Sequence, residues 1–174
     1  MLTLIRTLID IIRFRKGPDA IPYSMVLFAI VVGFWVAVDF LGELVVPDLG
    51  TTSFTSIVVS LLGLILFVVI VVLERRQARL LQTMTALIGC GAILGFVLTL
   101  VIAVMFRFKD VSIVAPLGMM IVWAITLFSI VVDGHILSRT LDRPRMYGVI
   151  IAFLIFSVQY YVSSALNQAQ TAAA

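Results

Sequence analysis

The sequence predicts an all-α, polytopic membrane protein with five transmembrane helices in one bundle and an N-terminal amphipathic interfacial helix. The chain has 174 residues, of which 63% are hydrophobic and 12% charged, and its mean hydropathy is +1.23. Soluble domains average about 45–50% apolar and about 25% charged residues. This composition excludes a water-soluble globular fold, a disordered chain and a nucleic-acid-binding domain.

Residues 1–16 form a separate element. Their polar residues recur at helical spacing and leave the rest of the surface to leucine and isoleucine. The segment is too short and too charged to span a bilayer, and it lacks the small-residue cleavage site of a signal peptide. We expect an amphipathic helix along the membrane interface, or alternatively a flap packed on the bundle. Gly17-Pro18-Asp19 should end this helix, and Pro22 suits the first turn of the next. The polar stripe comprises Thr3, Arg6, Thr7, Asp10 and Arg13.

Residues 22–166 contain the expected bundle. A transmembrane helix needs about 20 mostly apolar residues, and five stretches of the chain meet that requirement. They leave room for a short outer tail, 167–174, and for no extramembrane domain. The expected spans are 22–46, 53–73, 80–106, 112–134 and 146–166.

The distribution of basic residues predicts the orientation. Arginine and lysine are enriched in cytoplasmic loops of membrane proteins. Ten basic residues fall before the first span or in the second and fourth connections, whereas Arg107 and Lys109 fall on the opposite side. We therefore expect a cytoplasmic N-terminus and an outer C-terminus. The ten are Arg6, Arg13, Arg15, Lys16, Arg75, Arg76, Arg79, Arg139, Arg143 and Arg145.

Two acidic residues of the first span are candidates for an intramembrane polar site. Asp39 and Glu43 are four residues apart, so both lie on one helical face. Ionisable groups in hydrocarbon are costly and mark functional candidates. The pair could bind a proton or cation; alternatively, Glu43 reaches the headgroups and Asp39 bonds to a neighbouring helix. Gln159 and Tyr160 of the fifth span lie at a matching depth, and we expect one of them to be that partner.

A second polar cluster ends the fourth span, with Asp133, His135 and Arg139. Asp133 and His135 could begin a metal site, but two ligands are too few. No nucleophile or second acid accompanies them for acid–base catalysis. We expect a structural cluster in which Asp133 pairs with Arg139 or with the basic N-terminal segment. The sequence therefore predicts no catalytic residues, no metal and no cofactor.

Small residues in the third span predict close helix packing. Gly91 and Gly95 form a small-xxx-small pair of the kind that lets helices approach closely in lipid. We expect this pair to pack inside the bundle; the alternative is a dimer face.

The pattern resembles the Ypt-interacting (Yip) family and its small bacterial relatives. Two segments carry the likeness: FRKGPDAIPYS at 14–24 and WAITLFSIVVDGHILSRTL at 123–141. The resemblance implies five spans, a cytoplasmic N-terminus, a short outer tail and a non-enzymatic role in a bacterial inner membrane. The long acidic cytoplasmic domain of eukaryotic members is missing, so their GTPase-binding role is not implied.

These observations lead to a functional expectation. We expect an accessory or structural subunit, or a membrane organiser, whose partners are membrane lipids and other membrane proteins or a second copy, and not nucleic acid. The alternatives are a small transporter or channel component that uses Asp39 and Glu43, and a membrane enzyme acting on lipid. A transporter needs a polar path, but the second span has nothing more polar than Ser60 in its middle.

The topology can be tested with a reporter that is active only outside the cytoplasm. Fused after Ala174 the reporter should be active, and fused after Arg79 it should be silent, because basic residues keep the connection around Arg79 inside. The reverse pattern of activity would contradict the orientation.

Overall fold

The computed structural model describes residues 2–45, 53–108 and 111–173, and every regular element within these ranges is helical. Two short 3-10 helices precede long helices at turns of the chain. The elements are α1 (Leu2–Ile12), η1 (Pro18–Ala20), α2 (Met25–Val45), α3 (Ser53–Leu73), η2 (Gln77–Arg79), α4 (Leu80–Arg107), α5 (Val114–Leu141) and α6 (Arg145–Ala173).

Four of the described helices are long and apolar enough to cross a membrane. Their apolar stretches are Met25–Gly42, Gln77–Arg107, Val114–Leu141 and Arg145–Ala169. The described apolar stretch of α3, Ile57–Leu73, is shorter. The protein is therefore an all-helical membrane protein, as the composition indicates.

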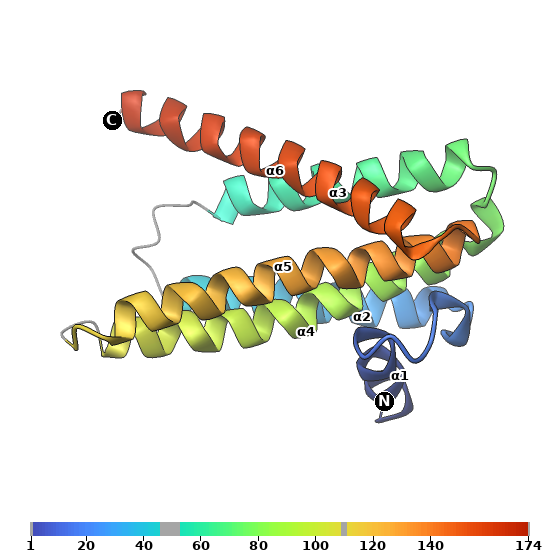
Figure 1. Ribbon diagram of the computed structural model, residues 1–174, viewed down its shortest axis with the longest axis horizontal. Coiled ribbons are helices and arrows are strands. Elements are labelled where there is room, and N and C mark those ends of the chain that lie inside the picture. The colour runs from blue at the N-terminus through green and yellow to red at the C-terminus, as the bar shows by residue number, and fades with distance from the viewer. Residues whose placement is uncertain (1, 46–52, 109–110, 174) are drawn as a thin grey trace.

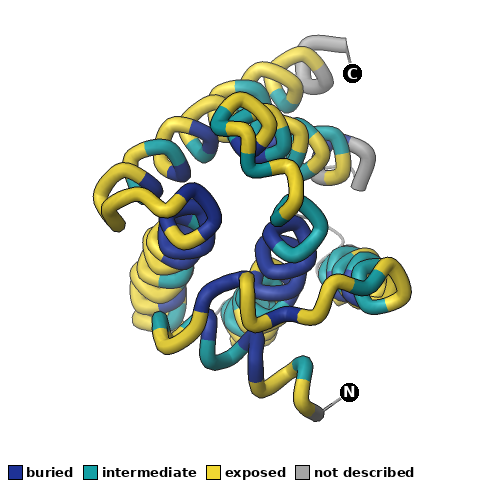
Figure 2. Tube along the Cα trace, turned by 90° about the vertical axis from the view of Figure 1, so that its right-hand side faces the viewer, coloured by how far each residue is buried: buried dark blue, intermediate teal, exposed yellow. Residues whose placement is uncertain are grey.

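The long helices run roughly side by side, with α4 between α2 and α5 (Figure 1). Helix α6 packs on α5, and α3 packs on α6. One end of the bundle carries the N-terminal segment 13–21 and the turns 74–79 and 142–144; we call it the basic end. Figure 2, which looks along the bundle from this end, shows buried positions on the faces where helices meet and exposed positions around the outside.

The closest helix contact joins α5 and α6. A Cβ atom at Gly148 would overlap the carbonyl oxygen of Gly134, and one at Gly134 would overlap the backbone of Val149. Gly134 and Ser138 of α5 both lie against Gly148 of α6, so small residues of the two helices meet. Glycine is required here because any side chain would force the two backbones apart.

Gly91 and Gly95 do not form the close helix contact that their spacing predicts. A Cβ atom at Gly91 would meet nothing within 4 Å, and one at Gly95 would meet only Val38, at 3.9 Å. Gly89 is the tight position of α4, since a Cβ atom there would lie 2.9 Å from the side chain of Leu8. The predicted close packing at Gly91 and Gly95 is therefore wrong, and the close backbone contact is found between α5 and α6.

Ion pairs tie the two turns of the basic end together. Arg79 Nη1 donates to the carbonyl oxygen of Thr140, which satisfies part of the α5 C-terminus, and lies 3.1 Å from Asp142 Oδ1. Arg143 Nη2 lies 3.3 Å from Glu74 Oε2. The hydrogen bond from Arg143, reinforced by one from the Tyr147 hydroxyl, holds the pKa of Glu74 below its usual value. The α3–α4 and α5–α6 hairpins are thereby joined at one end.

Three helix ends differ from the expected ones. Helix α1 ends at Ile12, because Phe14 adopts a left-handed conformation (φ 61°). Helix α2 begins at Met25, after Ser24 Oγ accepts a hydrogen bond from the Leu27 N–H; Pro22 precedes it. Helix α6 continues to Ala173, past the expected boundary at 166. The chain from 167 to 173 contains neither glycine nor proline, so nothing in it stops the helix.

We predict that Gly148→Ala destabilises the protein. The added methyl group would collide with the Gly134 backbone, and overpacking of this kind costs about 1–3 kcal/mol. Thermal unfolding in detergent should show a lowered melting temperature. Gly33→Ala is the matched control, because a Cβ atom there meets nothing within 4 Å. Equal melting temperatures for the two variants would contradict the close α5–α6 contact.

Candidate functional site

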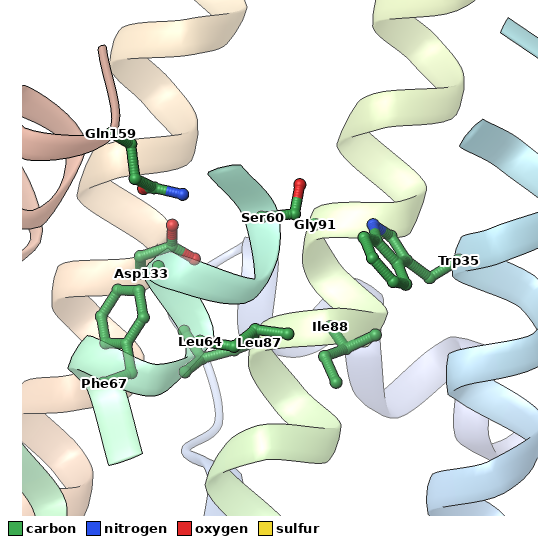
Figure 3. Close-up of a pocket in the computed structure, with 10 residues that line it drawn as sticks. Trp35, Ser60, Leu64, Phe67, Leu87, Ile88, Gly91, Asp133 and Gln159 are labelled. Carbon is green, nitrogen blue, oxygen red and sulfur yellow. The ribbon is translucent and has the colours of Figure 1, made fainter. Parts of the chain in front are cut away.

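A pocket of about 140 Å³ lies inside the bundle, and all five long helices contribute to its lining. Figure 3 shows Asp133 and Gln159 on one side of it and Trp35 on the other. One carboxylate, one amide, one hydroxyl and one indole therefore share a space inside a largely apolar protein. The lining residues are Trp35, Ser60, Gly63, Leu64, Phe67, Leu87, Ile88, Gly91, Asp133 and Gln159.

Asp133 supplies the only ionisable side chain of this pocket. It lies in α5 between the buried residues Val132 and Gly134, and its carboxylate points into the pocket (Figure 3). Within the ranges 2–45, 53–108 and 111–173, no hydrogen bond or ion pair to this carboxylate is found. An unpaired carboxylate at membrane depth is costly, so it marks the pocket as the candidate site.

Gln159 is held in place by α3. Its Nε2 donates to the carbonyl oxygen of Val59, 3.0 Å away. The amide lies against Gly63, where any Cβ atom would overlap it. Gly63 therefore makes the room that lets the Gln159 side chain lie between α6 and α3 at the edge of the pocket.

His135 faces the opposite way, toward the N-terminal segment. Its Nε2 lies 3.0 Å from the carbonyl oxygen of Lys16, and its ring meets Phe14 edge to face with centroids 5.2 Å apart. The ring is 2% exposed. His135 thus fixes the turn that follows α1.

Two further side chains hold the N-terminal segment on α4. Gln82 Nε2 donates to the carbonyl oxygen of Ile21 at 2.6 Å, and Cys90 Sγ lies 3.7 Å from the carbonyl oxygen of Leu8. Leu8 and Ile11 are buried against the bundle, at 4% and 0% exposure. Helix α1 is therefore docked through one apolar face, while Arg6 remains exposed.

The expected cluster of Asp133, His135 and Arg139 is not a single site. A helix turns about 100° per residue, which places Asp133 and His135 on nearly opposite faces. Asp133 faces the pocket, whereas His135 contacts residues 14 and 16, and the Arg139 side chain lies near Gly17 and is exposed. The expected pairing of Asp133 with Arg139 is absent from the described ion pairs. Asp133 and His135 are close in sequence, but the helix directs their side chains to opposite sides.

The expected hydrogen bond from Asp39 to Gln159 or Tyr160 is not found among the described residues. Gln159 bonds to Val59 of α3 instead, and Tyr160 is 62% exposed and stacks on Phe156. Asp39 is partly buried on α2 and does not line the pocket. The Glu43 side chain lies outside the part of the chain that the structure describes. Matching depth along the chain does not fix which helices are neighbours.

Within the described part of the chain, no group of three or more histidine, cysteine, aspartate or glutamate side chains could hold a metal ion. No protein-family model, curated protein or solved structure matches the chain. The candidate site therefore rests on its own geometry.

The sequence contained a signal for the pocket that its interpretation missed. Ser60, Asp133 and Gln159 are polar residues well inside apolar stretches, and such residues usually face the bundle interior. Grouping them requires knowing that α3, α5 and α6 are neighbours. Sequence reasoning named Asp133 and Gln159, but assigned them to different partners.

We predict that Leu8→Glu releases the N-terminal segment. The substitution places a carboxylate where Leu8 packs on Gly89, and a buried, uncompensated charge costs about 3–5 kcal/mol. Trypsin cleavage at residues 13–16 of the reconstituted protein should become at least about tenfold faster, since about 1.4 kcal/mol corresponds to that factor.

Thr3→Glu is the control, because Thr3 is exposed on the same helix. The cleavage rate of this variant should match that of the unmodified protein. Equal rates for Leu8→Glu and Thr3→Glu would show that α1 is not docked through Leu8.

Proposed function

We propose that this chain is a non-enzymatic, multi-pass inner-membrane protein. It acts as an accessory or structural subunit, or as a membrane organiser, that binds other membrane proteins or lipids. The observation that carries the proposal is the closed packing between the pocket and the basic end, because a protein without a polar path serves better as a scaffold than as a conduit.

Buried apolar side chains pack between the pocket and the basic end. Phe67 and Leu87 line the pocket on its basic-end side, and the next layer contains Val71, Met84 and Leu137, all at most 7% exposed. A packed apolar cluster opposes the passage of ions.

The buried hydroxyl groups of the same region are engaged with one another or with the backbone. Thr83 Oγ1 and Thr140 Oγ1 lie 2.9 Å apart. Thr85 and Ser138 donate to carbonyl oxygens of their own helices. Polar groups satisfied in this way stabilise the packing and provide no hydration path.

Five spans with a cytoplasmic N-terminus form part of the proposal. Helix α3 packs along α6, which is long enough to span, and Gln159 joins the two within their apolar stretches. If α3 also crosses, the turns at 74–79 and 142–144 lie on the same side as segment 13–21, and the positive-inside rule makes that side cytoplasmic.

The N-terminal helix fits a position at the membrane surface. Helix α1 crosses the bundle at a steep angle near the basic end (Figure 1). Its face with Leu8 and Ile11 is buried on the bundle, whereas Ile5 is 47% exposed and Arg6 is exposed. An exposed isoleucine beside basic residues suits the boundary between acyl chains and headgroups.

The alternative function, a small transporter or channel component using Asp39 and Glu43, would need a polar route from α2 to the basic end. Asp39 does not line the pocket, and the apolar layer around Phe67 and Leu87 closes the way beyond it. No observation in the described ranges favours this alternative over the accessory role.

Two measurements test the proposed function. Gentle extraction from native membranes should recover the 19.1 kDa chain in a larger complex with a reproducible companion protein or a second copy. Reconstituted into vesicles, the protein should conduct neither protons nor monovalent cations above the lipid background.

Asp39 variants separate the accessory role from transport. Asp39→Asn preserves size and most of the bonding capacity, so it should keep the melting temperature and companion recovery, whereas Asp39→Leu should lose some of both. Cation flux in the unmodified protein that disappears in a stably folded Asp39→Asn variant would overturn the proposal in favour of transport.

A further inference from the structure

The carboxyl group of Asp133 is the first reason to assign an occupant to the pocket. Its carboxylate faces a cavity of about 140 Å³ and has no hydrogen-bonding or ionic partner among the described residues. Every other lining residue is uncharged. Because an anion in a medium of low polarity needs a counter-charge, an occupant of this pocket should carry a positive charge or a proton.

The volume of the pocket limits what that occupant can be. A water molecule takes about 30 Å³ in the liquid, so the space corresponds to roughly four or five waters. Divalent cations need about six oxygen ligands, whereas the pocket offers one carboxylate, one amide and one hydroxyl. A molecule of several heavy atoms fills this space better than a bare metal ion.

The lining has two chemically different sides. Asp133 and Gln159 lie together on one side, and Trp35 lies on the other, with Leu87 and Ile88 along the wall between them (Figure 3). A carboxylate opposite an apolar, aromatic wall matches a molecule with a cationic head and a short hydrocarbon body.

We propose that the pocket binds a small protonated amine, with the ammonium group on Asp133 and the hydrocarbon part against Trp35. Gln159 and Ser60 provide further polar contacts for the ammonium hydrogens. Gly91 provides the space, since a side chain at this position would project into an open region with nothing within 4 Å. This inference is independent of whether the protein has a membrane partner.

The test uses Trp35 as the reporter. The chain has two tryptophans, so Trp123→Phe leaves Trp35 as the only indole; Trp123 is 51% exposed and does not line the pocket. The full chain in lipid nanodiscs is titrated with butylammonium chloride, with 1-butanol as the uncharged probe and sodium chloride as the inorganic one. A saturable change of Trp35 fluorescence is expected with butylammonium alone.

Two substitutions in this background address the charge and the space separately. Asp133→Asn should weaken butylammonium binding by at least about tenfold, because it removes the charge-assisted hydrogen bond. Gly91→Leu retains Asp133 and should abolish binding by filling the pocket. The matched controls are Asp39→Asn, a carboxylate outside the pocket, and Gly33→Leu, a glycine with equally open surroundings. Both controls should bind as the parent does, and all four melting temperatures are measured alongside.

Four results would overturn the inference. A folded parent without a saturable response to butylammonium has no amine site. An equal response to sodium chloride would make the pocket an inorganic cation site, and one to 1-butanol would make it an uncharged apolar site. Unchanged binding in folded Gly91→Leu would place the amine elsewhere.

Discussion

The hydrocarbon core of a membrane offers no hydrogen bonds, and this constraint explains most polar contacts in the bundle. A polar group taken into the hydrocarbon is costly unless it finds a partner within the protein. Gln159 meets this need at the carbonyl of Val59, and Thr83 and Thr140 meet it in each other. These contacts join helices that are distant in the sequence. The same hydrogen bonds therefore satisfy the polar groups and help to determine which helices pack together.

The same constraint accounts for the docked N-terminal segment. The segment must turn from α1 into α2 close to the bundle, and the turn exposes carbonyl groups that no helix satisfies. His135 meets the carbonyl of Lys16, and Gln82 meets that of Ile21. The single histidine of the chain therefore anchors the N-terminal segment. Asp133, two residues away on nearly the opposite face, is the group left facing a cavity.

Close approach of backbones is the second determinant of the architecture. Helices in lipid gain little from apolar contact alone and associate where small residues permit dense packing. Gly134 and Gly148 provide this on α5 and α6, and Gly63 admits the amide of Gln159 between α6 and α3. In contrast, a Cβ atom at Gly91 would meet nothing within 4 Å, and this residue lines the pocket. Glycine thus permits close backbone contact between α5 and α6 and leaves space for the pocket at α4.

The sequence by itself determined the membrane class, the helical elements and the concentration of charge at the connections, because apolar length and charge distribution act locally along the chain. It also named Asp133, His135 and Gln159 as residues of interest. Only the tertiary structure decided their partners, since these depend on which helices are adjacent and how each is rotated. That choice rests on a few contacts, such as Gly134 with Gly148, which small-residue spacing suggests equally for Gly91 and Gly95.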